Sequence, residues 1–337
     1  MNNNHTKRLV YIDVIAGIMI IWMIFGHCRH FSSTKLPFPN FLGFFMPWFF
    51  YKSGYFFKTL NQNQLLRKDT GKLLRYLFVY ALIGWVVWSL CGLADHSLRP
   101  KDCIVQPIFT FLSTSVIKPN GSLWFLFTLF FVRQAGNVVI KNDEKNILIL
   151  TAAFICFAGA YLLNTIEWYN KSWWFGNFFS GLCFFLLGYW FKDKEQKKTT
   201  LFLSTLFYFG VIGAFYIGKI GFPVLYMHAN KMFSGNYILF YPFALAEIVM
   251  INNIFHYLCK HIKFNILEYV GQNAMYYYVT HWILLILIAF IAKVVFHIER
   301  PLYLLIMLSV TCLIFLPFII CFIKLLKSKY HILSKIL

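Results

Sequence analysis

Ten apolar runs, most of them about 20 residues long, restrict the folds that this sequence can adopt. They lie at residues 10–30, 41–58, 73–94, 122–140, 147–164, 173–191, 200–219, 236–257, 274–296 and 302–326. A helix of about 20 residues crosses about 30 Å of hydrocarbon. Since 60% of the residues are hydrophobic and 13% are charged, a water-soluble domain could not bury this much apolar surface. The sequence therefore predicts an all-α, polytopic membrane helical bundle of about ten transmembrane helices, in a single domain over residues 1–337.

A shorter apolar stretch at residues 104–117 contains Pro107 and is followed by Pro119. Proline interrupts the hydrogen bonds of a helix, so we expect a re-entrant or interfacial piece of a loop here. No cleavage site of small residues follows the first apolar run, which we therefore expect to be a retained span. The eight cysteines form no Cys-x-x-Cys motif, which favours small buried hydrophobes over a metal site or disulfides.

The net charge of +19 comes from 31 Lys and Arg residues against 12 Asp and Glu residues. Most of the basic residues fall in alternate connections between the runs, and none forms a stripe typical of a nucleic-acid surface. Lys and Arg concentrate in the cytoplasmic loops of membrane proteins. With an even number of spans, this bias predicts that both termini are cytoplasmic. The expected surroundings are membrane lipid, with no nucleic acid as a partner.

Ionisable groups inside the predicted spans are functional candidates, because charge is costly in hydrocarbon. They are Asp13, His27, Lys52, Glu247 and His281. Either histidine can be a neutral ring bonded to a neighbouring helix, or a general base whose ordinary pKa suits proton transfer near neutral pH. Asp13 can compensate a helix dipole, and Lys52 can extend its ammonium group to the membrane surface. Glu247 either pairs with a cation such as Lys52 or lines a water-filled cavity.

Five sequence elements, in order along the chain, resemble the membrane-bound acyltransferase-3 family. "YIDVIAGIMIIWMIFGH" is similar to the family's opening helix and contains Asp13 and His27. "FFMPWFFYKSGYFF" and "LLRKDTGKLLRYLFVY" are similar to its second helix and to the basic connection with the third helix. "NGSLWFLFTLFF" carries Trp124, and "YVGQNAMYYYVTH" resembles a late helix with Tyr278 and His281.

The resemblance implies an integral membrane O-acyltransferase at the bacterial inner membrane. It would move an acyl group, commonly acetyl, from cytoplasmic acyl-CoA to a hydroxyl of an envelope saccharide or a similar acceptor. Acyl-CoA would be a substrate, with no permanently bound cofactor and no metal ion. His27 would be the general base, with Asp13 as a second catalytic candidate. The expected coenzyme contacts are Arg67, Lys68, Lys72, Arg75 and Lys52. The expected substrate contacts are Ser53, Trp124, Glu247 and His281.

Two positions depart from the family pattern. Ala16 stands where the family usually has a basic residue that serves the coenzyme, and Phe45 stands where many relatives have histidine. We therefore hypothesise that Lys52 supplies the missing cation. The basic connection is equally explained by the usual cytoplasmic excess of positive charge. Two other functions remain open: a catalytically silent relative that acts as a scaffold, and a proton-coupled transporter or flippase that uses His27, Glu247 and His281 as a relay.

Overall fold

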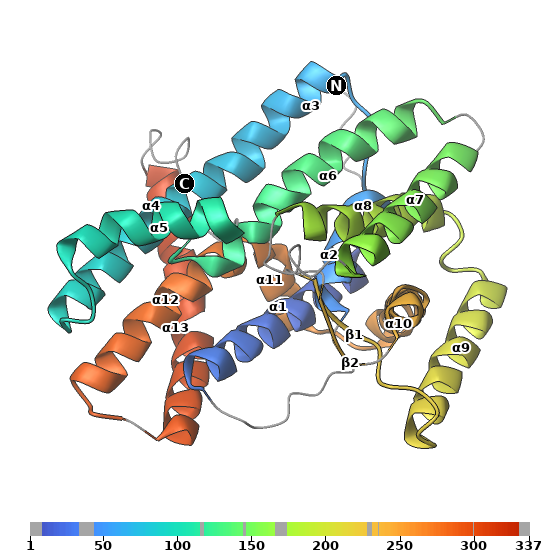
Figure 1. Cartoon of the computed structure of the whole chain (residues 1–337). Coiled ribbons are helices and arrows are strands. Elements are labelled where there is room, and N and C mark those ends of the chain that lie inside the picture. Colours follow the sequence, from blue (N-terminus) through green and yellow to red (C-terminus); the bar gives the residue numbers. More distant parts are fainter. Residues whose placement is uncertain are drawn as a thin grey trace.

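The computed structural model describes residues 9–33, 44–114, 118–143, 146–165, 174–227, 231–234, 236–298 and 300–329. Within these ranges the fold is a bundle of helices, as predicted (Figure 1). The first half contains α1 (Val10–Phe31), α2 (Phe45–Tyr55), α3 (Gln62–Asp69), α4 (Arg75–Ala94), α5 (Pro100–Thr114) and α6 (Trp124–Lys141). The second half contains α7 (Ile147–Thr165), α8 (Trp174–Phe191), α9 (Lys198–Tyr216), α10 (Tyr237–His261), α11 (Asn265–Gln272), α12 (Ala274–Val294) and α13 (Pro301–Lys329).

Three short elements interrupt or extend this pattern. A π-helical turn, η2 (Thr70–Leu74), joins α3 to α4 in one continuous helical segment, and a 3₁₀ turn, η3 (Gly121–Leu123), leads into α6. Two short antiparallel strands, β1 (Val224–Tyr226) and β2 (Lys231–Ser234), lie between α9 and α10.

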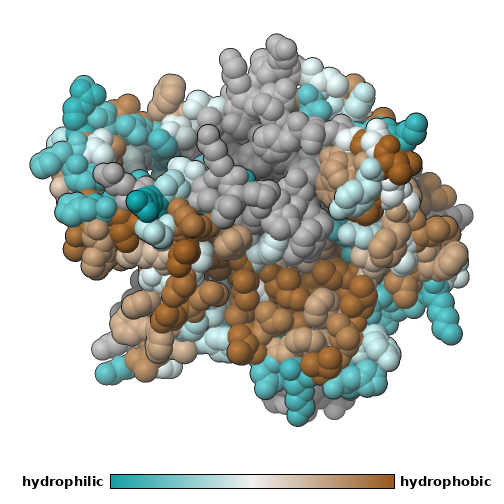
Figure 2. All heavy atoms as spheres, turned by 90° about the horizontal axis from the view of Figure 1, so that it is seen from below, coloured by the Kyte–Doolittle hydropathy of each residue, from teal (hydrophilic) through white to brown (hydrophobic). Residues whose placement is uncertain are grey.

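Eight helical segments in the described part of the chain are long and apolar enough to cross a membrane. They are Val10–Phe31, Gln62–Ala94, Gly121–Lys141, Ile147–Thr165, Lys198–Tyr216, Tyr237–His261, Ala274–Val294 and Pro301–Lys329. Large apolar side chains such as Phe78, Phe109, Phe154 and Phe202 are exposed on the outside of the bundle. Figure 2 shows a broad hydrophobic area on one face, bordered by hydrophilic residues. Such an exposed apolar surface fits a lipid surrounding.

Two of the ten predicted runs, 41–58 and 173–191, are not among these eight segments. The run at 173–191 corresponds to α8, in which Asn177–Phe191 counts as a shorter apolar helix. The run at 41–58 forms α2, whose 11 residues span about 16 Å at 1.5 Å per residue and cannot cross the hydrocarbon alone. Instead α2 packs closely against α8, where Gly54 lies against the backbone of Phe185 and Gly188 lies against the backbone of Tyr51. The stretch at 104–117 was predicted to be a re-entrant or interfacial piece of a loop. Its residues 104–114 belong to the helix α5, which holds Pro107 inside it, and residues 115–117 lie outside the described residues.

The helices α1 and α11 also pack backbone to backbone. A side chain at Gly17 would collide with the carbonyl of Leu267, and one at Gly271 would collide with the carbonyl of Asp13. Small residues allow this close approach between membrane helices. Since α12 begins directly after α11, this contact sets the position of α12 relative to α1. In Figure 1, α12 and α13 lie side by side and α1 runs next to them.

Basic residues gather at one end of the bundle, which we call the basic end. Here α1, α4 and α12 begin and α13 ends, as the contacts of Gly271 with Asp13 and of Lys327 with Tyr76 and Tyr276 require. The basic residues near it include Arg67, Lys68, Lys72, Arg75, Lys324 and Lys327.

Candidate active site

The two membrane histidines, 254 residues apart in the sequence, meet in the structure. His27 lies 17 residues after the start of α1, roughly 25 Å along its axis, and His281 lies seven residues into α12. The Nδ1 atom of His27 is 2.8 Å from Nε2 of His281. The ring planes are within 8° of parallel, and their centres are 5.0 Å apart, much farther than the two nitrogens. The rings therefore meet edge to edge, as an in-line N–H···N hydrogen bond requires.

The hydrogen bonds of this pair define which nitrogens carry protons. Nδ1 of His281 lies 3.0 Å from the backbone carbonyl oxygen of Tyr277. A carbonyl oxygen can only accept, so Nδ1 of His281 donates, and the neutral ring then has an acceptor at Nε2. His27 must donate to that acceptor through Nδ1. In the neutral pair, Nε2 of His27 is therefore left with an unshared lone pair that can take a proton.

Burial holds the pair in this arrangement. The side chain of His281 is fully buried, whereas His27 is half-buried. Trp282 packs its ring edge-on against His27, with centres 4.8 Å apart, and Phe31 packs against Trp282 in turn. We call the set His27, His281 and the Tyr277 carbonyl the histidine relay. As in other enzymes, a buried hydrogen-bond acceptor here fixes the tautomer of a histidine.

An apolar pocket of about 680 Å³ lies between α1, α11, α12 and α13, and neither His27 nor His281 is among its lining residues. Its lining includes Cys28, next to His27 in the chain, and Tyr277, which supplies the relay's carbonyl. The remaining lining is mainly aliphatic and aromatic, with Ile24, Val270 and Leu316 among its residues. A volume of this size is typical of pockets that hold small organic ligands.

The Trp124 element reaches the same helix as His281. The hydroxyl of Tyr278 donates to the carbonyl oxygen of Ser122 in η3, and the side chain of Asn120 donates to the carbonyl oxygen of Val279 at 3.3 Å. These bonds hold the start of α6 against α12, within three residues of His281. Trp124, the first residue of α6, is half-buried. Of the predicted substrate contacts, His281 contacts His27 directly, and Trp124 lies at the start of the helix that these bonds hold against α12.

Asp13 lies elsewhere. It is in the first turn of α1, 14 residues before His27, which corresponds to about 21 Å along the helix. Its side chain is buried, and its backbone carbonyl contacts Gly271 at the α1–α11 crossing. A carboxylate at this end of a helix also compensates the helix dipole. The structure therefore places Asp13 where it supports the packing that positions α12, not within reach of the relay.

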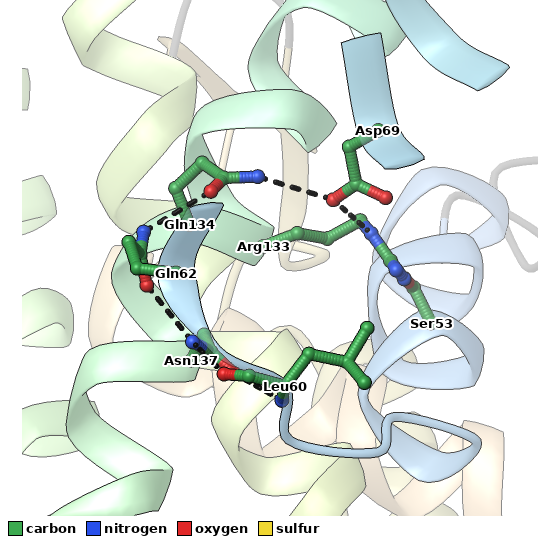
Figure 3. A network of polar contacts seen from close by, with 7 residues as sticks. All are labelled: Ser53, Leu60, Gln62, Asp69, Arg133, Gln134 and Asn137. Atoms are coloured by element: carbon green, nitrogen blue, oxygen red, sulfur yellow. Dashed lines mark hydrogen bonds and ion pairs between the residues drawn. The ribbon is translucent and has the colours of Figure 1, made fainter. Parts of the chain in front are cut away.

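Ser53 belongs to a separate polar network (Figure 3). Its hydroxyl accepts from a terminal nitrogen of Arg133 at 3.2 Å, and Nε of Arg133 donates to Asp69 at 2.9 Å. Gln134 also donates to Asp69 at 3.2 Å, and Asn137 bonds to both backbone groups of Leu60. Asp69 is 3% exposed and Arg133 18%, so this is a largely buried ion pair. It joins α2, α3 and α6 directly before the π-helical turn.

The other predicted site residues are distributed around the bundle. Glu247 is buried in α10 and interacts electrostatically with Tyr208 of α9. The ammonium group of Lys52 lies 5.2 Å from the ring centre of Trp48, one turn away in α2. Ala16, at the position where the resemblance leads us to expect a cation, is fully buried in the hydrophobic core.

The predicted coenzyme contacts divide into two groups at the basic end. Arg67 and Lys68 are exposed in the last turn of α3. Arg75 is half-buried at the start of α4 and lies over the ring of Tyr76, 5.6 Å from its centre. Lys72 is exposed as well, so among the basic residues of the α3–α4 segment named above only Arg75 is sheltered from solvent.

A buried carboxyl group that the sequence analysis overlooked lies between α8 and α9. Glu195 is 1% exposed and accepts a hydrogen bond from the side chain of Asn252 in α10. Asn252 in turn accepts from the indole of Trp48 at 2.9 Å, and Tyr11 lies near the carboxyl group. Burial away from water raises the pKa of Glu195 from 4.5 to about 7. In the sequence, Glu195 stands among lysines and gives no sign of burial.

This shift predicts a pH-dependent stability. The carboxyl ionises above about pH 4.5 in the unfolded chain but only above about 7 in the folded one, so stability falls as pH rises between these values. The loss is about 3 kcal/mol, at 1.36 kcal/mol per pKa unit. Thermal unfolding in detergent between pH 4.5 and 8 should therefore show wild type losing stability relative to Glu195→Gln. The exposed neighbour gives the control, since Asp193→Asn should follow wild type. Parallel curves for wild type and Glu195→Gln would contradict the prediction.

A family model described as an acyltransferase domain, that of the acyltransferase-3 family, matches residues 9–325, nearly the whole chain. No match is found among curated proteins or among solved structures. The matched residues include every part of the histidine relay. The chain therefore belongs to the acyltransferase-3 family and is a multi-pass membrane protein with an acyltransferase domain.

Proposed function

We propose that this protein is an O-acyltransferase that moves an acyl group from acyl-CoA, acetyl-CoA being the simplest donor, to a hydroxyl of an envelope saccharide or a similar acceptor. The observation that supports this most is the histidine relay, in which the Nδ1 and Nε2 bonds leave Nε2 of His27 as a proton acceptor. Its half-buried position gives an acceptor hydroxyl access to that nitrogen.

In the proposed reaction, Nε2 of His27 takes the proton of the acceptor hydroxyl as its oxygen attacks the thioester carbonyl carbon. The C–S bond then breaks, the acyl group stays on the acceptor oxygen as an ester, and the thiolate of coenzyme A takes the proton. The imidazolium formed at His27 is stabilised because His281 accepts from its other nitrogen. His281 is a positioning residue in this scheme. The apolar pocket between α1, α11, α12 and α13, which Cys28 and Tyr277 line, suits the hydrocarbon portion of an acyl group.

Orientation follows from charge. We propose that the basic end faces the cytoplasm of a bacterium, in its inner membrane, with both termini on that side. Acyl-CoA would then enter from the basic end, and the acceptor would reach His27, which lies roughly 25 Å farther along α1.

The buried Ala16 supports a second candidate, a catalytically silent relative that acts as a scaffold. With an apolar side chain in the core, this position offers no charge to the coenzyme. In the O-acyltransferase proposal, Lys52 supplies the positive charge that is missing at Ala16. A fully active Lys52→Met variant would exclude this role of Lys52.

The test is mass spectrometry of envelope glycans from a deletion strain that carries wild type, His27→Ala or no gene. We expect wild type alone to restore an acyl mass increment, whose size identifies the acyl group. Equal restoration by His27→Ala would remove His27 from catalysis. Identical glycans in all three strains would favour the scaffold over the proposed transferase.

A further inference from the structure

The apolar pocket between α1, α11, α12 and α13 opens sideways, toward the surrounding lipid. Cys28 and Leu316 at its floor are buried. Phe25, Ile266 and Leu313 at its rim are exposed on the outside of the bundle. An apolar pocket of about 680 Å³ stays free of water, because its walls offer water few hydrogen-bond partners. A hydrocarbon chain that enters from the side is therefore the kind of molecule that fills it.

The pocket extends from the basic end toward the middle of the bundle. On α11, which precedes α12 at the basic end, its lining includes Asn265 and Tyr269. On α13 it reaches from Pro317 to Ser309, which lies eight residues, or about 12 Å, farther from the basic end. The long direction of the pocket is therefore that of a lipid chain whose headgroup lies at the basic end.

A lysine stands at the end of the pocket where such a headgroup would lie. The ammonium group of Lys324 in α13 lies 5.4 Å from the ring centre of Tyr269, which lines the pocket. Lys324 is exposed and forms no ion pair within the described residues. The carboxylate of α11, Glu268, accepts from Gln272 at 2.9 Å and interacts electrostatically with Cys259 of α10. Lys324 is thus available to an anionic group.

A buried hydroxyl lies near this cation. Tyr277 of α12 lines the pocket and is 4% exposed, and its hydroxyl has no hydrogen-bond partner in the described structure. That hydroxyl is close enough to Tyr269 and Cys321 to interact with them electrostatically. Buried hydroxyls normally have a partner, so this one points to a missing acceptor. The ester carbonyl oxygen of a lipid, which lies just inside its phosphate, would accept from it.

We propose that the pocket binds one chain of an anionic phospholipid, with the phosphate at Lys324 and an ester carbonyl oxygen at the Tyr277 hydroxyl. Basic pockets between transmembrane helices bind anionic lipid headgroups in other membrane proteins. The pocket also suits the hydrocarbon portion of a donor's acyl group, but its sideways opening and the cation at the basic end favour a lipid. The inference does not rest on acyl transfer, because it needs only a bundle that lies in a membrane.

The experiment measures lipid binding by the full-length protein in detergent, by native mass spectrometry, with phosphatidylglycerol and phosphatidylcholine of identical chains. We expect wild type to bind phosphatidylglycerol about fivefold more tightly, the factor that one basic residue contributes near a membrane surface. Lys324→Gln should remove this preference. Tyr277→Phe should weaken the binding of both lipids alike, because both carry the ester carbonyl. Lys198→Gln, which removes an exposed charge from the start of α9, is the matched control and should behave as wild type.

A variant that narrows the opening tests the position of the chain. Leu313→Trp enlarges an exposed residue at the rim, so the fold should persist while both lipids bind more weakly. Equal Kd values for the two lipids in wild type, or equal losses in Lys324→Gln and Lys198→Gln, would overturn the proposal. Unchanged lipid binding by Leu313→Trp would overturn it as well, and weaker binding of decanoyl-CoA by that variant would then assign the pocket to the donor.

Discussion

Replacing His281 with alanine is expected to lower the rate of acyl transfer about 10²–10⁴-fold, although His281 is not placed to touch the substrate. Its Nε2 accepts from Nδ1 of His27 and thereby keeps Nε2 of His27 unprotonated. Without that acceptor, the neutral His27 ring can carry its proton on Nε2, where it cannot serve as a base. The measurement is kcat of the purified protein with acetyl-CoA and an acceptor identified from the glycan analysis.

A conservative variant separates this role from a purely structural one. In His281→Gln, the side-chain carbonyl oxygen can occupy about the position of Nε2 and accept from His27, so a substantial part of the rate should return. The pH profile gives a second readout. Loss of the acceptor destabilises the imidazolium of His27, so the acidic limb of kcat/KM, which requires the unprotonated ring, should move to lower pH. His30→Ala, an exposed histidine in the last turn of α1, is the control and should retain activity. Equal loss in His281→Ala and His281→Gln, with unchanged pH profiles, would contradict the relay.

Local sequence patterns predict the helices better than the contacts between them. The apolar runs lead to the correct fold class because each residue adds 1.5 Å and hydrocarbon excludes other backbone structures. They do not reveal that α2 is short, nor that it packs closely against α8 at Gly54 of α2 and Gly188 of α8. The run at 274–296, in contrast, begins at the residue where α12 begins, and so predicts that His281 lies near the start of its helix.

For the candidate site, too, the sequence predicts individual residues better than the contacts between them. His27 and His281 stand out in the sequence because polar residues inside apolar runs are rare. Their pairing, the Tyr277 carbonyl and the Trp282 contact depend on helix rotation, which a single sequence does not encode in any short pattern. Asp69 and Arg133 were overlooked as site residues because Asp69 lies between two runs and Arg133 in the later part of its run, where a charge can extend to water. Burial at these positions arises only when helices converge.

The buried Asp69–Arg133 pair carries the largest predicted effect on stability. Arg133→Met would leave the Asp69 carboxylate 3% exposed and without its cation, which costs about 3–5 kcal/mol. We expect low yield in detergent and a clearly lowered melting temperature. The pair joins α3 to α6, and Asn137 and Gln134 hold the same segment, so part of the fold should persist.

The double variant tells whether the ion pair or its separate charges matter. In Asp69→Leu with Arg133→Met, neither charge is left unpaired, and buried ion pairs replaced by apolar residues often retain stability. The double variant should therefore melt above Arg133→Met alone. The chain provides a matched control in Arg99–Asp102, a pair with similar geometry at 3.0 Å but with Arg99 72% exposed. Asp102→Asn should leave the melting temperature unchanged, because water screens exposed pairs. A double variant less stable than Arg133→Met would mean that the ion pair itself, rather than the avoidance of an unpaired carboxylate, stabilises the join between α3 and α6.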